Sequence, residues 1–111
     1  MNKIEVRKII ENGGATLNRK GEAVSFSRGY QVSKKDCYVI TVENVDKIVE
    51  AIKELLNSIG KNDFVGVWVN DGAVYVDISE NIKNRSKALH VGHARKQKSV
   101  FEWSTGLCLE C

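Results

Sequence analysis

The stretch that most constrains the fold of this chain is FVGVWVNDGAVYVDIS, residues 64–79. Two runs rich in β-branched and aromatic residues flank Asn70-Asp71-Gly72, and a short polar turn ending in glycine is a strong signal for a tight reversal. We therefore predict a β-hairpin. Because side chains alternate along a strand, a loop at Asp71-Gly72 also fixes which residues share a face. The face expected to be core is wholly aliphatic: Val65, Val67, Val69, Val74, Val76 and Ile78.

The opposite face of the hairpin has a different chemistry. It pairs Trp68 with Tyr75 and Gly66 with Asp77. One interpretation is that a helix covers the two rings and that Asp77 makes a structural hydrogen bond. The other is a binding face, on which the rings stack on a ligand, Gly66 lets that ligand approach the backbone, and Asp77 accepts hydrogen bonds from a base or sugar edge.

Size and composition favour one compact domain over residues 1–111, with 42% hydrophobic residues available for a core. No apolar run reaches the length of a membrane span, and the N-terminus lacks the apolar block of a signal peptide, so we expect a cytoplasmic protein without a membrane partner. Three cysteines, an odd number, argue against a secreted disulfide scaffold. The net charge of +3 permits anion binding but falls short of the basic footprint of a duplex-DNA binder.

The best helix signal follows Glu43-Asn44. Apolar residues recur at helical spacing from Val45 to Ile59, with Asn44 as N-cap and Gly60 as the stop. A shorter helix is predicted over residues 3–12, with Ile4, Ile9 and Ile10 as buried positions. Between these helices we predict a small hairpin and two strands: residues 15–17 with 23–26, residues 30–33, and residues 37–42.

A basic helix is predicted after the central hairpin. It begins at Asn84 or Ser86, runs to about Lys98, and carries Gly92, whose helix-breaking cost suggests close packing on the sheet. Its basic side chains form either a solvated face or an anion site. A last hairpin, residues 100–103 with 107–109, can extend the sheet. The predicted fold class is α+β: an antiparallel sheet of several hairpins with two main helices packed on it and a short N-terminal helix.

Catalytic and metal sites find little support in the sequence. A zinc site from His90, His93, Cys108 and Cys111 has valid ligand types, but residues three apart on a strand point to opposite faces. Cys37 with a histidine lacks any nucleophile motif, and no phosphate-binding loop or paired-carboxylate arrangement is visible. We therefore expect a protein that is not an enzyme and has no cofactor and no metal.

A family resemblance is carried by the order of several short motifs that span most of the chain. They are Gly21-x-x-Val24-x-Phe26, Gly29-Tyr30-x-Val32-Ser33, Gly66-x-Trp68, Val74-Tyr75-x-Asp77-Ile78-Ser79, Ala88-x-x-x-Gly92 with Gln97, and Phe101-x-Trp103-x-x-Gly106. In this order the chain resembles small anti-defence proteins of phages and mobile elements. Within that group it is similar to the anti-Thoeris sponge proteins, which bind a cyclic ADP-ribose isomer and hide this immune signal from its effector.

The resemblance implies a non-enzymatic homo-oligomer that traps a nucleotide-derived signalling molecule at subunit interfaces in the host bacterial cytoplasm. Trp68 or Tyr75 would stack on adenine and Asp77 would take a ribose or base edge, while Arg28, Arg95 and Lys96 would hold the pyrophosphate. The candidate site also includes two neighbours on the basic helix and after it, His93 and Gln97. His93 stands where related sequences often have a basic residue, which adds a pH dependence.

Two other functions remain open. A protein-binding inhibitor of a bacterial immune nuclease, similar to anti-CRISPR proteins, would use the same rings and basic helix against a protein surface. A small interaction domain without any small-molecule ligand is the third. A concave pocket favours the sponge, and a flat apolar patch beside a charged helix favours the inhibitor.

Overall fold

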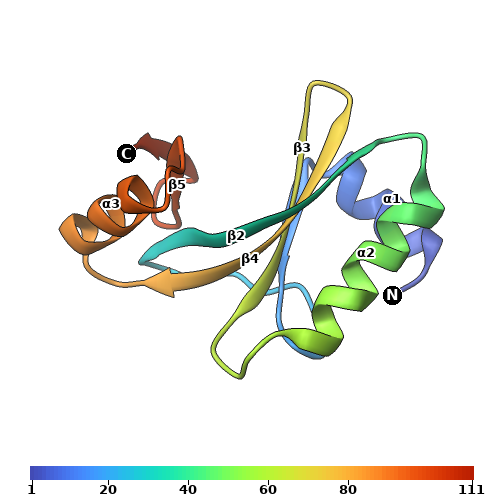
Figure 1. Ribbon diagram of the computed structural model, residues 1–111, viewed down its shortest axis with the longest axis horizontal. Coiled ribbons are helices and arrows are strands. Elements are labelled where there is room, and N and C mark those ends of the chain that lie inside the picture. Colours follow the sequence, from blue (N-terminus) through green and yellow to red (C-terminus); the bar gives the residue numbers. More distant parts are fainter.

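A computed structural model describes residues 1–111 and gives an α+β fold of three helices and one antiparallel sheet (Figure 1). The helices are α1 (Lys3–Glu11), α2 (Val45–Ser58) and α3 (Arg85–Ala94). The strands are β1 (Gly14–Leu17), β2 (Tyr30–Thr41), β3 (Phe64–Asn70), β4 (Ala73–Ile82), β5 (Ser99–Glu102) and β6 (Leu107–Glu110). The predicted fold class is confirmed.

The sheet has six strands in the order β1-β3-β4-β2-β5-β6. Its long central strands, β2 and β4, link two ends of the molecule: α1 and α2 lie at one end, and α3 with β5 lies at the other (Figure 1). The last hairpin extends the sheet as predicted, because β5 pairs with β2 at Tyr30 and Gln31. Each end has its own apolar cluster.

The register of the central hairpin is the predicted one. Val69 lies opposite Val74, Val67 opposite Val76, and Trp68 opposite Tyr75. The loop is Asp71-Gly72, and both residues have positive φ, 55° and 76°, as a two-residue type I′ reversal requires. The valine face is core, since Val65, Val67, Val74 and Val76 are all buried.

The helices pack on this aliphatic face of the sheet. Ile48, Ile52 and Leu55 of α2 are buried against the valines, as its helical spacing predicts. At the far end α3 covers residues of the same face of β4 and β2, with Ile82 and Val32 buried beside Ala88. The opposite face carries no helix, so we call it the helix-free face: the side of the sheet that includes Gly66, Trp68, Tyr75, Asp77, Ser79 and Gln31.

Three local predictions need correction. Ile4 of α1 is exposed, and Val6 is the buried residue, because the face of α1 that meets α2 and β1 is centred on Val6. The strands expected at 30–33 and 37–42 are one strand, β2, with irregularities between Ser33 and Lys35 and between Asp36 and Tyr38 that hid its continuity. The small hairpin is reduced to a bridge between Leu17 and Ala23, since β1 pairs instead with β3.

Gly92 has the predicted packing role. A Cβ at this position would lie 2.6 Å from the Cys111 sulfur and 2.9 Å from Val100 Cγ1. The absence of a side chain therefore lets α3 lie against β5 and the end of the chain.

The N-caps of the two longer helices differ in quality, which predicts different mutational costs. The Asn84 side chain accepts a hydrogen bond from the Lys87 N–H at 2.8 Å, whereas Asn44 accepts from the Lys47 N–H at 3.4 Å. We expect Asn84→Ala to lower the free energy of unfolding by about 1 kcal/mol, a typical cost of cap loss, and Asn44→Ala to cost less. Chemical denaturation of both variants checks this, and an equal or reversed order would show that cap geometry does not set the cost.

Candidate ligand-binding site

The helix-free face is strongly curved. The rings of Trp68 on β3 and Phe101 on β5 lie 5.5 Å apart between centroids, although β4 and β2 separate these strands. Neighbouring strands are spaced by about 4.8 Å, so a flat sheet would hold the two strands roughly 14 Å apart. The sheet therefore curls into a half-barrel with aromatic side chains inside.

An aromatic chain continues from this contact across the concave face. Phe101 meets Trp103 at 4.9 Å, and Trp103 meets Phe26 at 5.4 Å. Phe26 also meets Phe64 of β3 at 5.5 Å in an edge-to-face geometry. Phe26, in the loop between β1 and β2, thus contacts both β3 and the residue that follows β5. These ring contacts stabilise the curled sheet on its concave side.

Polar side chains form the floor below these rings. Every buried polar or charged residue of the chain lies on the helix-free face: Thr16, Gln31, Asp77 and Ser79. The Gln31 side chain donates to Ser79 Oγ at 2.9 Å and accepts from the Trp103 indole N–H at 3.0 Å. Gln31 therefore fixes the orientation of the Trp103 ring.

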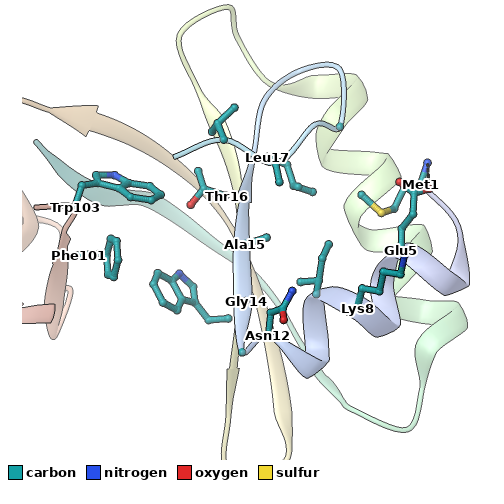
Figure 2. Close-up of a pocket in the computed structure, with 16 residues that line it drawn as sticks. Met1, Glu5, Lys8, Asn12, Gly14, Ala15, Thr16, Leu17, Phe101 and Trp103 are labelled. Atoms are coloured by element: carbon teal, nitrogen blue, oxygen red, sulfur yellow. Dashed lines mark ion pairs between the residues drawn. The ribbon is translucent and has the colours of Figure 1, made fainter. Parts of the chain in front are cut away.

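A cavity of about 610 Å³ opens beside these rings, around the edge strand β1 (Figure 2). On one side of β1 lie Phe101 and Trp103, toward which Thr16 points, and Trp68 also contributes to the lining; on the other side lie α1 residues such as Lys8 (Figure 2). Lys8 is the only basic side chain in the lining. Stacking on aromatic rings is therefore the main interaction this cavity can offer.

Asp77 is the most perturbed group of the concave face. Burial, together with the negative charge of Asp36, raises its pKa to about 7, although the Ser33 hydroxyl and the Gly66 N–H act in the opposite direction. Its Oδ1 atom is buried without a hydrogen-bond partner. This oxygen lies over Gly66, where a Cβ would be only 2.3 Å away, so Gly66 makes room for the carboxyl group of Asp77 rather than for a ligand.

The sheet brings two carboxyl groups together that the sequence did not reveal as a pair. Asp36 of β2 lies directly opposite Asp77 of β4. The absence of paired carboxylates, expected from the sequence, is therefore wrong for the folded chain. Asp36 is exposed and held by Ser33 and by Gln97, whose side chain donates to it at 3.4 Å.

The structure does not bring all the predicted site residues together; one group lies on the helix-free face. Trp68 lines the cavity, and Tyr75 lies beside it across the strand pair, with exposed fractions of 37% and 39%. No helix covers the two rings. Asp77 lies two residues further along β4 on the same face, below the surface.

The second location is the turn after α3, which docks on the irregular part of β2. Arg95 donates to Glu80 at 2.7 Å and to the Ser33 carbonyl at 3.3 Å, and Gln97 reaches Asp36. The guanidinium of Arg95 is thus occupied within the chain. Lys96 of the same turn is exposed, and so are His93 on α3 and Arg28 in the loop between β1 and β2; none of the three lines the cavity.

Sequence reasoning missed the aromatic partners of Trp68 in the site. Phe101 and Trp103 belong to β5 and its end, and Phe26 to a loop, so no local pattern connects them with β3. The sequence did offer one signal. Most aromatic residues outside the central hairpin lie close to a glycine at which a turn can form.

The structure brings together no group of three or more histidine, cysteine, aspartate or glutamate side chains suited to a metal ion. Cys108 is exposed, while Cys111 lies against Gly92. None of the three helices combines the length and apolar character needed to cross a membrane.

Comparison with known proteins adds no assignment: no protein-family model, curated protein or solved structure matches this chain.

Proposed function

We propose that this protein is a non-enzymatic, phage-type anti-defence protein that binds and sequesters a nucleotide-derived immune signal of the cyclic ADP-ribose isomer class. One observation carries the binding part of the proposal: Trp68, Phe101 and Trp103 line a cavity of about 610 Å³. That volume falls in the range of small-molecule sites, about 300–1,000 Å³. Aromatic rings favour stacking with a planar group such as a nucleobase.

Within one chain, this site has few basic side chains that could bind a phosphate. Lys8 is the only basic side chain in the cavity lining, and it lies across β1 from Phe101 and Trp103, where it would contact a phosphate as a point charge. Arg28 and Lys96 do not line the cavity, and Arg95 is paired with Glu80. Contacts from Arg95 and Lys96 to the same ligand would require a second subunit or a rearrangement of the turn after α3, and a contact from Arg28 would require a second subunit or a rearrangement of the loop between β1 and β2.

Removing the Trp68 ring tests the site. We expect Trp68→Ala to abolish the thermal shift produced by cyclic ADP-ribose isomers, because stacking is lost, while the unliganded protein still folds, because Trp68 is 37% exposed, with a melting temperature several degrees lower, because the contact with Phe101 is lost. Trp68→Phe keeps a ring and should retain part of the shift. Leu107→Ala, an exposed apolar residue on β6, is the matched control and should bind normally.

Sequestration is distinguished from turnover by recovering the ligand after the protein is denatured. Intact ligand in stoichiometric amount supports a sponge, and a modified ligand would show that the protein is an enzyme. A Trp68→Ala protein that binds normally, or one that fails to fold, would remove Trp68 from the proposed site.

A protein-binding inhibitor is the second candidate, and one observation favours it. Val39, Tyr75 and Trp68 are neighbours across β2, β4 and β3, and they form an exposed apolar row on the helix-free face. Apolar rows of this kind occur at protein interfaces. Absence of any nucleotide-induced shift, together with capture of a purified immune nuclease, would support this candidate over the sponge.

A further inference from the structure

The outer edge of β2 is unpaired over most of its length. β5 covers this edge only at Tyr30 and Gln31, while β4 pairs with the other edge from Tyr30 to Thr41. The turn after α3 shields the next part, since Arg95 bonds the Ser33 carbonyl and Gln97 bonds Asp36. Residues 38–41 have no such cover, and we call them the free β2 edge.

The free β2 edge lacks the usual protection against strand addition. Both irregularities of β2 lie before Tyr38, and from there to Thr41 the pairing with β4 is regular. Its residues, Tyr38-Val39-Ile40-Thr41, favour β structure and include no charge and no proline. Val39 is 65% exposed. A regular, uncharged and exposed strand edge is a template for another strand.

A groove follows this edge on the helix side. Its volume is about 540 Å³, and it lies between the four residues of the free β2 edge and the exposed side of α2, including Lys47, Glu50 and Glu54. A strand added to the edge would place alternate side chains over this groove and over the row of Val39, Tyr75 and Trp68.

We infer that the free β2 edge pairs antiparallel with the same edge of a second copy of this chain. A two-fold axis at Val39 would place Val39 opposite its own copy and Tyr38 opposite Ile40 of the second copy, an aromatic and β-branched pair on the helix side. The apolar rows of both copies would then form one continuous stripe across the joined sheets.

Charge at the two ends of the edge favours the antiparallel arrangement. Lys34 and Lys35 precede the free β2 edge, and Glu43 follows it. Antiparallel pairing about Val39 brings Lys35 of one copy toward Glu43 of the other, whereas parallel pairing would place lysine beside lysine. The inference uses no property of the ligand cavity, so it stands or falls independently of the proposed function.

Sedimentation and light scattering test the inference. We expect the wild-type protein to have a concentration-dependent mass that approaches twice 12.4 kDa, and Val39→Lys to remain at the monomer mass because a charge on the edge blocks pairing. Ile4→Lys is the matched control: Ile4 is 64% exposed on α1, and its variant should dimerise like wild type. Hydrogen exchange of the 38–41 amides should slow as the concentration rises.

A cross-link tests the axis itself. In a cysteine-free background (Cys37→Ser, Cys108→Ser, Cys111→Ser), Val39→Cys should form a covalent dimer on mild oxidation, because directly opposed Cα atoms lie about 4.5–5.5 Å apart, within disulfide range. Ile4→Cys in the same background should not. A wild-type protein that stays monomeric with fast-exchanging 38–41 amides, or a dimer that Val39→Lys leaves intact, would overturn the inference.

Discussion

At about pH 8, Asp77→Asn should be more stable than the wild-type protein. The pKa of Asp77 is near 3.8 in the unfolded chain and about 7 in the fold. Between these two pH values Asp77 is therefore protonated in the folded protein and ionised in the unfolded chain. Stability therefore falls as the pH rises from about 4 to about 7 and is level above that. Each pKa unit corresponds to about 1.4 kcal/mol, so the penalty at pH 8 is on the order of 4 kcal/mol.

Asparagine cannot ionise, and the variant should lose this pH dependence. Urea denaturation of both proteins near pH 4.5, 6 and 8 measures it, and the difference in unfolding free energy should grow with pH. Asp36→Asn is the control, because it removes the exposed neighbouring charge while leaving Asp77 to titrate at a lower pKa. Parallel pH profiles for wild type and Asp77→Asn would show that Asp77 is not perturbed in the fold.

The central hairpin and α2 could be predicted because their signals are local. A two-residue loop at Asp71-Gly72 fixes every cross-strand pair of β3 and β4 by counting, and the observed register agrees. Helical spacing likewise identified the buried side of α2. In the hairpin the buried residues alternate as side chains do along a strand, and in α2 they recur at helical spacing.

The curl of the sheet could not be predicted in this way. It depends on contacts such as Trp68 with Phe101, which join residues 33 positions apart on strands that do not pair. The two irregularities of β2 also change which residues face which side, so alternation counted along Tyr30 to Thr41 fails after Ser33. The pairing of Asp36 with Asp77 follows from those irregularities and was therefore hidden.

These differences change the interpretation of Gly66. From the sequence, the missing side chain at Gly66 was interpreted as room for a ligand beside Trp68 and Tyr75. In the fold the gap is filled by the Asp77 carboxyl group of the neighbouring strand. The binding surface thus moves from the Gly66 position toward β1, where Trp68 meets Phe101 and the cavity opens.

Gly66→Ala should be strongly destabilising for this reason. A Cβ at Gly66 would lie 2.3 Å from Asp77 Oδ1 and 3.2 Å from its Cγ, and Asp77 is buried, so its carboxyl group cannot move aside freely. Overpacking in a buried region costs about 1–3 kcal/mol, and we expect the upper end of this range because the displaced group is polar. Gly60→Ala is the matched control: its Cβ would meet Asp63 Oδ2 at 3.5 Å, an ordinary contact.

A double-mutant cycle identifies the group responsible for the clash. Asp77→Ala removes the carboxyl group, so Gly66→Ala should cost little when introduced into that background, and the coupling free energy should exceed about 1 kcal/mol, as for residues in direct contact. Urea denaturation of the four proteins at a single pH gives this quantity. If Gly66→Ala costs the same with and without the Asp77 carboxyl group, the clash is with the backbone, and Asp77 does not occupy the space above Gly66.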